Sequence, residues 1–496
     1  MPVVRPFEAI RAEIAALDAA LKLLSWDRQT VMSPGGASAR AEHTSRLARQ
    51  RHALLVGDEF GQALDRFQTA HAGHPLQAAI HSHWDRERAI AVRTPVELAL
   101  RIARVGSEAY SAWRVAKPAD DFDAMAPYLA EQFGLARELS DALRQPHHAD
   151  VYDPLLDLFE PRLATSEVQA WFGPTRTALR RLLAEIREAT PICVNLSGEW
   201  NPAALRGAMA EIIRELGFDF DRGRLDLANN AFCANISGSD LRMTTRASDH
   251  LRGVYSSSLH EFGHAIYEQS VDDALEGTGI DTGVSLSVHE SQSRLWENIV
   301  GRSRGFLDRF RAVLVRHVPG LERFSADDLY RGLSAVEPTY LRVGADEVSY
   351  SLHIMIRFDL ERALLNRELD IRDLPEAWNA RYAEDLGVTV RRASEGCLQD
   401  VHWPKGSIGY FPTYAIGNLI GGQLLEVYRA EPTNARDFEV GKYGSLREWL
   451  AERIYRHGSR YPATELIAQS VGGPIDPAAW LRYLRNKYGE LYGLSS

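Results

Sequence analysis

Apolar residues recur at intervals of three and four along most of the chain, a spacing that places them on one face of an α-helix. Stretches of this kind predict helices over residues 7–24, 125–143, 168–189, 203–216 and 446–457. Short turns with proline or glycine, such as QPHHADVYDP, separate them. Runs of alternating β-branched residues are scarce. The pattern therefore predicts a mainly α fold.

Residues 230–247, NAFCANISGSDLRMTTRA, depart from this helical pattern. Two short stretches compatible with β-strands lie on either side of Gly-Ser-Asp, residue types that favour tight turns. This arrangement predicts a small β-hairpin. No internal repeat, low-complexity tract or long glycine and serine linker interrupts the rest of the chain. We therefore expect one large domain over residues 1–496, with room for two lobes.

Composition and charge narrow the classes of function. The formal net charge is -10, whereas a nucleic-acid partner requires clustered lysine and arginine on a basic domain. Cys193, Cys233 and Cys397 are too few and too scattered for a disulfide framework or a thiolate metal site. The N-terminus carries charges where a signal peptide is apolar, and no apolar run reaches the length of about 18 residues that a membrane span requires. The sequence favours a cytoplasmic protein that binds neither nucleic acid nor a membrane.

The segment SSSLHEFGHAIYEQS, residues 256–270, contains two histidines four positions apart, with a glutamate directly after the first. Apolar residues recur at helical spacing through this region. His260 and His264 then project from one helix face, one turn apart, which suits two imidazole ligands of one metal ion. Glu261 would reach over the open position of the metal and act as the base that takes a proton from water. The alternative, from the motif alone, is an amphipathic helix with two hydrogen-bonded histidines.

A catalytic zinc site has three protein ligands and leaves one place for water, so a third donor is expected downstream. Residues 287–300, SVHESQSRLWENIV, predict a second helix that a loop could bring beside the first. His289 and Glu290 are neighbours in this helix, and both residue types can bind a metal ion. Successive helix residues point about 100° apart, so only one of the two can face the metal. The spacing leaves the choice between them open.

Three other segments place charged or aromatic residues where a site could form. LRVGADEVSYSLHIMIRFDLE puts Arg342 into an otherwise apolar helical stretch, for which buried ion pairs between helices are an equally good interpretation. QDVHWPKGSIGYFPTYAIGN carries His402 and Tyr410 among glycines and a proline, as expected of a loop that lines a cavity. DLRMTTR places Asp240 and Arg242 on the predicted hairpin, where a strand edge could pair with an extended peptide. Asp240 and Arg242 are therefore candidate substrate contacts.

Taken together, these segments resemble the carboxypeptidase Taq family of metallocarboxypeptidases. The resemblance runs nearly end to end, through LLSWDRQTVMSPGGASARAEH, VYDPLLDLFEP, DLRMTTR, HEFGH, HESQSRLWENIVGRSR, LRVGADEVSY, GCLQDVHWPKGSIGYFPTYAIGNL and KYGELYG. It implies a large helical ellipsoid with a deep central groove, zincin-type active-site helices, and a small β-hairpin or sheet beside the metal site. It also implies a cytoplasmic homodimer, activated by Zn2+ or Co2+, that removes single residues from the free C-termini of peptides.

The resemblance also implies roles for individual residues. In the family's His-Glu-Ser motif the glutamate is the metal ligand, which here is Glu290. Arg342 lies in the segment that matches the family's Ile-Arg-x-x-Ala-Asp motif, and it would bind the terminal carboxylate of the substrate. His402 belongs to the matching Gly-x-x-Gln-Asp-x-His-Trp motif, and Tyr410 to the tyrosine-containing stretch after it. These two residues would stabilise the reacting carbonyl.

One segment departs from the family pattern. Members carry His-Pro-Phe shortly before Asp-x-Arg-x-Thr, whereas this chain has Asn230-Ala231-Phe232 and so lacks an ionisable ring and a fixed φ angle. The departure bears on how the hairpin is set beside the groove, and hence on substrate preference. Two alternatives stay open: an endopeptidase or dipeptidase, and a non-catalytic helical scaffold or peptide-binding protein that retains the site.

Overall fold

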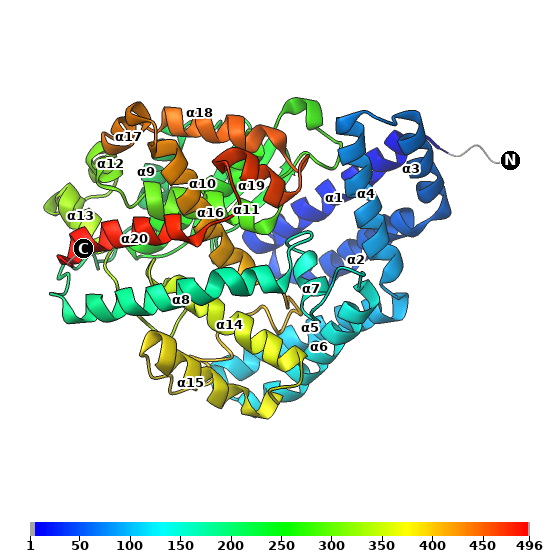
Figure 1. Ribbon diagram of the computed structural model, residues 1–496, viewed down its shortest axis with the longest axis horizontal. Coiled ribbons are helices and arrows are strands. Elements are labelled where there is room, and N and C mark those ends of the chain that lie inside the picture. The colour runs from blue at the N-terminus through cyan, green and yellow to red at the C-terminus, as the bar shows by residue number, and fades with distance from the viewer. Residues whose placement is uncertain (1–4, 495–496) are drawn as a thin grey trace.

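The computed structural model describes residues 5–494 of the chain (Figure 1). This part of the chain contains twenty α-helices and one three-stranded sheet, so the prediction of a mainly α fold is confirmed. In chain order the helices are α1 (Phe7–Thr30), α2 (Ala37–Val56), α3 (Asp58–Ala70), α4 (Pro75–Arg93), α5 (Val96–Ala119), α6 (Phe122–Leu143), α7 (Asp153–Asp157), α8 (Thr165–Glu188), α9 (Pro202–Glu215), α10 (Leu251–Gln269), α11 (Leu286–Arg294), α12 (Arg304–His317), α13 (Ala326–Leu333), α14 (Tyr350–Leu365), α15 (Leu374–Leu386), α16 (Pro412–Arg429), α17 (Pro432–Glu439), α18 (Gly444–Arg453), α19 (Ala463–Val471) and α20 (Pro477–Tyr492). None of them combines the length and the apolar composition that crossing a bilayer requires.

Four of the five predicted helices occur with their ends shifted, as α1, α6, α8 and α9. The fifth, predicted over residues 446–457, ends early, because α18 stops at Arg453 and a single 3-10 turn follows. The chain turns there because the N–H of Ser459 donates to the carbonyl of Ile280 at 3.0 Å. Gly458 has a φ of 50°, which a right-handed helix cannot contain. A contact distant in sequence therefore overrides the local periodicity.

A small sheet packs against α10. Strands β2 (Cys233–Ser237) and β3 (Asp240–Arg246) pair in antiparallel fashion and form the predicted hairpin. Strand β1 (Gly223–Ala228), which we did not predict, pairs with β3 in parallel, so β3 is the central strand. The hydroxyl of Thr245 on β3 accepts a hydrogen bond from Ser258 of α10 at 2.9 Å. The sheet is thereby fixed against the helix that carries HEFGH.

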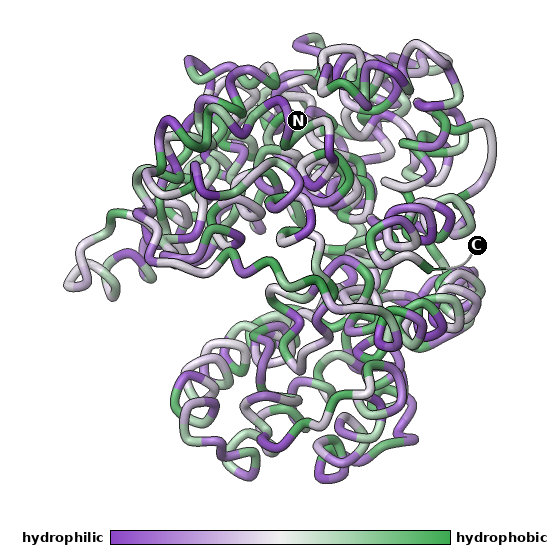
Figure 2. Tube along the Cα trace, turned by 90° about the vertical axis from the view of Figure 1, so that its left-hand side faces the viewer, coloured by the Kyte–Doolittle hydropathy of each residue, from purple (hydrophilic) through white to green (hydrophobic). Residues whose placement is uncertain are grey.

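Buried apolar side chains form one large core that extends from Ala116 to Leu491, and a second, smaller core that joins α1, α3 and α4. In Figure 1 helices α5, α6, α14 and α15 form the lower part of the molecule, and α14 contacts both α6 and α15. Figure 2 shows this part set apart from the larger upper part on one side of the view and joined to it on the other. The large core includes side chains of both parts. The single domain over the whole chain stays a prediction.

Residues 341–349, predicted as the start of a long helix, are not helical, and α14 begins only at Tyr350. Gly344 has a φ of 90°, which ends any helical continuation at this point. The carboxylate of Asp346 accepts a hydrogen bond from the N–H of Ser349 at 2.8 Å. Such a side chain to backbone bond offers the chain a local turn in place of a helix.

Two glycines allow the helices of the candidate site to approach closely. A Cβ on Gly263 of α10 would lie 2.5 Å from the Cα of Ser293 on α11. A Cβ on Gly417 of α16 would lie 2.9 Å from the Cγ of Glu290. Helix α11, which continues as a π-helical turn over Leu295–Val300, is therefore held between α10 and α16. These contacts set the position of Glu290 relative to the HEFGH helix.

Candidate metal centre

His260 and His264 lie one turn apart on α10, with largely buried side chains. The Nε2 atoms of both rings face the same carboxylate oxygen, Oε2 of Glu290 on α11, at 3.7 Å and 3.6 Å. Two ligands that each lie about 2.1 Å from a tetrahedral metal ion are about 3.4 Å apart. The three donor atoms therefore have nearly the spacing that a small divalent ion such as zinc requires.

The two candidates for the third donor occupy different positions. The Nδ1 atom of His289 lies 2.6 Å from the Nδ1 atom of His264, and its Nε2 atom lies 2.6 Å from the carboxylate of Glu268. His289 thus contacts the nitrogen of His264 that is not turned to Glu290. Of the neighbouring pair, Glu290 is the one that faces both Nε2 atoms, as the family resemblance implies.

Charged side chains behind the donors orient them. The Nε of Arg294 donates to Oε1 of Glu290 at 2.7 Å, which leaves Oε2 directed at the histidines. The Nδ1 of His260 donates to Glu297 at 3.0 Å, and the same carboxylate accepts from Arg302 at 3.2 Å. Because the Nδ1 atom of His260 is engaged in this way, its Nε2 atom is the nitrogen available to a metal ion.

Burial and neighbouring charge set the protonation of these groups. Burial alone would raise the pKa of Glu290, but the charges of His260 and Arg294 outweigh it and hold the pKa well below its ordinary value. Burial lowers the pKa of His264 to about 4. A carboxylate and a neutral imidazole are the forms that bind metal ions. Burial raises the pKa of Glu261 to about 7, so this carboxyl group exchanges a proton near neutral pH.

A cavity of about 350 Å³ opens onto the three donors. Its walls include Glu261 from α10, Phe232 and Cys233 from the hairpin, and Tyr410 and Tyr414 from the start of α16 and the loop before it. Glu261 therefore borders the same cavity as the three donor residues. This is the placement that a base requires when it acts on a water molecule beside a metal ion.

His402 is not among the residues that line this cavity, whereas Tyr410 is. The Nε2 atom of His402 lies 3.3 Å from the hydroxyl of Tyr414, one side chain behind the wall. Burial lowers the pKa of His402 to about 3 and raises the pKa of Tyr410 to about 12, so both groups are neutral at pH 7. The buried carboxylate of Glu361 holds the loop from behind, since it accepts a hydrogen bond from Trp403 at 2.7 Å.

Arg342 lies in a buried cluster of charges. Its Nε and Nη2 atoms donate to one oxygen of Asp400 at 3.0 Å and 2.8 Å, and its Nη1 atom donates to the hydroxyl of Tyr350 at 3.3 Å. Arg357 donates to the other oxygen of Asp400 at 2.6 Å. Burial lowers the pKa of His353 beside them, so that ring is neutral. Two guanidinium groups share one carboxylate, and the cluster carries a net positive charge.

Asp240 and Arg242 lie on β3 and pair with each other at 2.8 Å. The guanidinium of Arg242 also lies over the ring of Trp26 at the end of α1, 4.5 Å from its centroid. Neither residue is among those that line the metal-site cavity. Their role as substrate contacts stays a prediction.

The segment Asn230-Ala231-Phe232 is tied to the central strand of the sheet. The N–H of Phe232 donates to the hydroxyl of Thr244 at 2.9 Å, and the N–H of Thr244 donates to the carbonyl of Phe232 at 2.9 Å. Thr244 is fully buried. The segment is therefore anchored without the histidine and proline that the family resemblance led us to expect here, and Phe232 forms part of the cavity wall.

A second group, His147, His148 and Asp157, also has donor atoms close enough to share a metal ion. Its His148 is already engaged, because the Nδ1 atom of this ring accepts the N–H of Gln145 at 3.1 Å. The proton of neutral His148 then lies on Nε2, so neither nitrogen is free for a metal ion. The donors on α10 and α11 have no such conflict.

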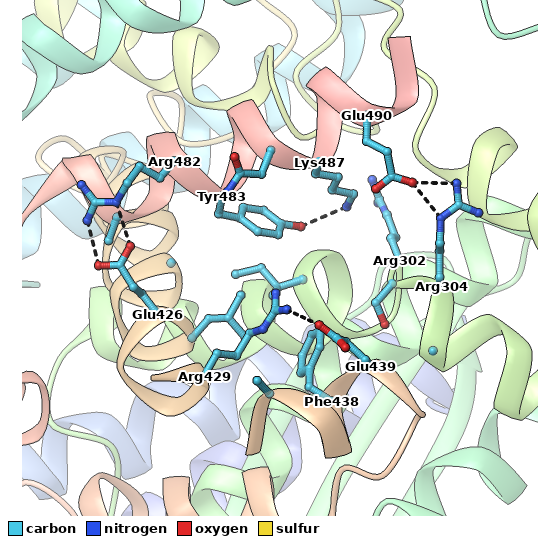
Figure 3. Close-up of a pocket in the computed structure, with 18 of the residues that line it drawn as sticks. Arg302, Arg304, Glu426, Arg429, Phe438, Glu439, Arg482, Tyr483, Lys487 and Glu490 are labelled. Carbon is cyan, nitrogen blue, oxygen red and sulfur yellow. Dashed lines mark hydrogen bonds and ion pairs between the residues drawn. The ribbon is translucent and has the colours of Figure 1, made fainter. Parts of the chain in front are cut away.

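A larger cavity, of about 920 Å³, lies between α12, α16, α17 and α20 (Figure 3). Arginines on its walls are matched by carboxylates in three ion pairs: Arg482 with Glu426 at 2.7 Å, Arg429 with Glu439 at 2.9 Å, and Arg304 with Glu490 at 3.0 Å. Neither of the two groups of metal donors borders this cavity. By size alone the larger cavity would be the candidate active site. The donors on α10 and α11, however, line the smaller cavity.

The residues that hold the donors in place were not predicted from the sequence. Glu268 follows His264 by four positions, and Arg294 and Glu297 follow Glu290 by four and seven. These spacings put the supporting residues on the same helix faces as the donors. Charged residues at helical spacing from each donor could therefore have indicated these supporting residues in the sequence.

Comparisons with known proteins show the family of this chain. The family model described as carboxypeptidase Taq (M32) metallopeptidase matches residues 6–488. The chain is 36% identical over 508 residues to thermostable carboxypeptidase 1 of Thermus thermophilus, with 98% of each chain covered. It is 35% identical over 485 residues to the protein of the same name in Pyrococcus furiosus, with 96% of each covered.

Solved structures show the same relationship. The crystal structure of the M32 carboxypeptidase from Deinococcus radiodurans R1 has a TM-score of 0.94 and 36% sequence identity, with 98% of this chain and 99% of that chain covered. The structure of Pyrococcus furiosus carboxypeptidase has a TM-score of 0.94 and 34% identity, with 97% and 98% covered. The chain therefore belongs to the carboxypeptidase Taq (M32) metallopeptidase family.

Proposed function

We propose that this chain is a metallocarboxypeptidase that releases single residues from peptide C-termini, with Zn2+, or Co2+ as a substitute, held by His260, His264 and Glu290. The observation that carries the proposal is the convergence of these three donors on one cavity, beside the carboxylate of Glu261. Two imidazoles and one carboxylate form a typical donor set of a catalytic zinc ion in a peptidase. Membership of the family supports the same class of reaction.

Glu261 is the proposed general base. A bound divalent ion would lower the pKa of water and polarise the peptide carbonyl. Glu261 would accept the proton of the attacking water and then donate it to the leaving amine. A carboxyl group with a pKa of about 7 suits both steps, because it gains and loses a proton near neutral pH.

Tyr410 and His402 are proposed to stabilise the negative charge that develops on the carbonyl oxygen. Tyr410 borders the cavity, and its raised pKa of about 12 keeps the hydroxyl protonated as a hydrogen-bond donor. His402 is proposed to act from behind Tyr414, to which it is hydrogen-bonded. One well-placed donor to such an oxygen contributes about 3 kcal/mol to transition-state stabilisation.

Arg342 is proposed to bind the terminal carboxylate of the substrate. The net positive charge of its cluster favours an anion. Tyr350, which accepts a hydrogen bond from Arg342, also packs against Arg294, 3.8 Å from the ring centroid. Arg294 in turn binds Glu290, so the cluster lies one tyrosine away from the residues that support the proposed metal site. A substrate carboxylate bound this close to the metal would restrict cleavage to the last peptide bond.

Replacing Arg342 with alanine should raise KM about 10- to 100-fold for a peptide with a free C-terminus, because a charge-assisted hydrogen bond contributes about 1.5–3 kcal/mol. KM for the same peptide with an amidated C-terminus should change little. Arg342→Lys keeps the charge but lacks the planar guanidinium that can bind a carboxylate through two N–H groups. Its KM for the free peptide should therefore lie between those of the alanine variant and the wild type. Steady-state kinetics on the two peptides measures these effects, and thermal unfolding of each variant controls for folding.

Equal losses on the free and amidated peptides would refute the role of Arg342. The products test the reaction class independently, since a carboxypeptidase shortens the peptide one residue at a time from its C-terminus. Internal fragments from the wild-type protein would instead indicate an endopeptidase, and refute the proposal.

Further parts of the proposal rest on the sequence pattern and, for the homodimer, on the family resemblance. We propose that Asp240 and Arg242 contact the substrate, and that the protein is a cytoplasmic homodimer without a nucleic-acid partner. Cys193, Cys233 and Cys397 are free thiols, which supports a reducing compartment. The net charge of -10 disfavours nucleic acid as a ligand.

A further inference from the structure

A continuous chain of contacts lies behind the proposed metal site. The Nδ1 atoms of His264 and His289 are 2.6 Å apart, and the Nε2 atom of His289 is 2.6 Å from Oε1 of Glu268. Tyr267 packs against the ring of His289, with 5.2 Å between the ring centroids. Glu268 and His264 lie on α10 and His289 lies on α11, and these three residues form the relay. The contacts lead from the carboxylate of Glu268 through the imidazoles of His289 and His264 to the proposed metal position.

The carboxylate of Glu268 fixes the direction of this chain. It accepts hydrogen bonds from the amide nitrogen of Asn235 at 2.5 Å, from the hydroxyl of Thr282 at 2.7 Å and from the N–H of Gly283 at 3.2 Å. Donors thus surround both of its oxygens, and Glu268 is an acceptor in every contact. The neighbouring nitrogen of His289 must therefore carry the hydrogen and donate it.

The direction then passes through His289 to His264. A neutral imidazole has one donor and one acceptor nitrogen, so the Nδ1 atom of His289 is an acceptor. It accepts the Nδ1–H of His264, and this leaves the Nε2 atom of His264 with a free lone pair. That atom is the one that faces Glu290. In the opposite direction His264 would carry a hydrogen on Nε2, where it would exclude a metal ion.

We infer that His289 and Glu268 are positioning residues that hold His264 in the tautomer and orientation in which Nε2 is presented to the metal. The inference rests on the proposed function, since it concerns residues around the proposed metal site. It gives His289, the rejected candidate for the third ligand, a different role in the same site. The tautomer of His260 is fixed by one direct hydrogen bond, from its Nδ1 atom to Glu297.

Zinc affinity tests the inference without reference to catalysis. Metal-free protein competes with a chromogenic chelator for Zn2+, and the dissociation constant of each variant is compared with that of wild type. His289→Leu removes the acceptor for His264 and should weaken zinc binding about 10- to 100-fold, as is typical when such a partner is lost. His289→Asn places an amide oxygen near the position of Nδ1, and should bind zinc nearly as tightly as wild type. His43→Leu, at an exposed position on α2, is the matched control and should have no effect.

His289→Gln provides a second comparison should the leucine variant not fold, as circular dichroism would show. Its amide reaches the position of Nε2 and contacts Glu268, but offers no acceptor to His264, so it should bind zinc as weakly as the leucine variant. Equal affinity of the asparagine variant and the variants without an acceptor would overturn the inference. Wild-type protein that binds zinc without releasing C-terminal residues would refute the proposed function instead, and the affinities would still decide on the relay.

Discussion

Replacing Glu261 with glutamine should lower kcat about a thousandfold while the zinc content of the protein stays at the wild-type level. Glutamine has nearly the size of glutamate, and Glu261 is not one of the three donors, so the metal position should be preserved. An amide cannot take a proton from water, so the variant lacks the base. Peptide hydrolysis and elemental analysis on the same sample measure the two quantities.

The pH profile adds a second readout for this variant. Burial raises the pKa of Glu261, and protonation removes the base, so wild-type activity should fall as the pH decreases. The residual activity of Glu261→Gln should lack this acidic limb. Glu276→Gln, at an exposed position outside the cavity, is the control and should behave as wild type. Near-normal activity in the Glu261 variant would show that another group acts as the base.

Replacing Gly263 with alanine should both destabilise the protein and weaken its zinc binding. The added Cβ would overlap the carbonyl oxygen of Gln292 and lie 2.5 Å from the Cα of Ser293, so α11 must move away from α10. Overpacking of this kind costs about 1–3 kcal/mol of the free energy of unfolding. Glu290 moves with α11, which should separate the third donor from the histidines. Denaturant unfolding and zinc titration measure the two effects.

Gly489→Ala is the matched control for that substitution. Gly489 lies within α20, and apart from the adjoining backbone of that helix no atom of the described residues lies within 4 Å of an added Cβ. Alanine should therefore leave zinc binding unchanged and stabilise the protein by up to about 1 kcal/mol. Wild-type stability and zinc affinity in the Gly263 variant would show that the close contact of α10 and α11 does not set the position of Glu290.

The sequence was informative where the relevant physics is local. The HEFGH helix follows from its own apolar spacing, and the shared face of His260 and His264 follows from helical geometry alone. The hairpin of β2 and β3 could be predicted because its turn residues lie between its strands. The helical fold class follows from the same periodicity, repeated along the chain.

Features that depend on contacts between distant segments could not be predicted in this way. The choice between His289 and Glu290 depends on how α11 is rotated against α10, which the close approach at Gly263 helps to set. Strand β1 pairs in parallel with β3, and such pairing has no local turn to indicate it. The predicted start of α14 was wrong because Asp346 forms a turn, which the apolar periodicity around it does not reveal.

A crystal structure of the zinc-loaded protein, with an anomalous difference map at the zinc absorption edge, would show whether His260, His264 and Glu290 hold the metal ion. We expect one strong peak within about 2.0–2.2 Å of His260 Nε2, His264 Nε2 and Glu290 Oε2, since these are the usual zinc–nitrogen and zinc–oxygen distances. A peak at His147 and His148, or a zinc ion bound by the two α10 histidines with Glu290 turned away, would contradict it.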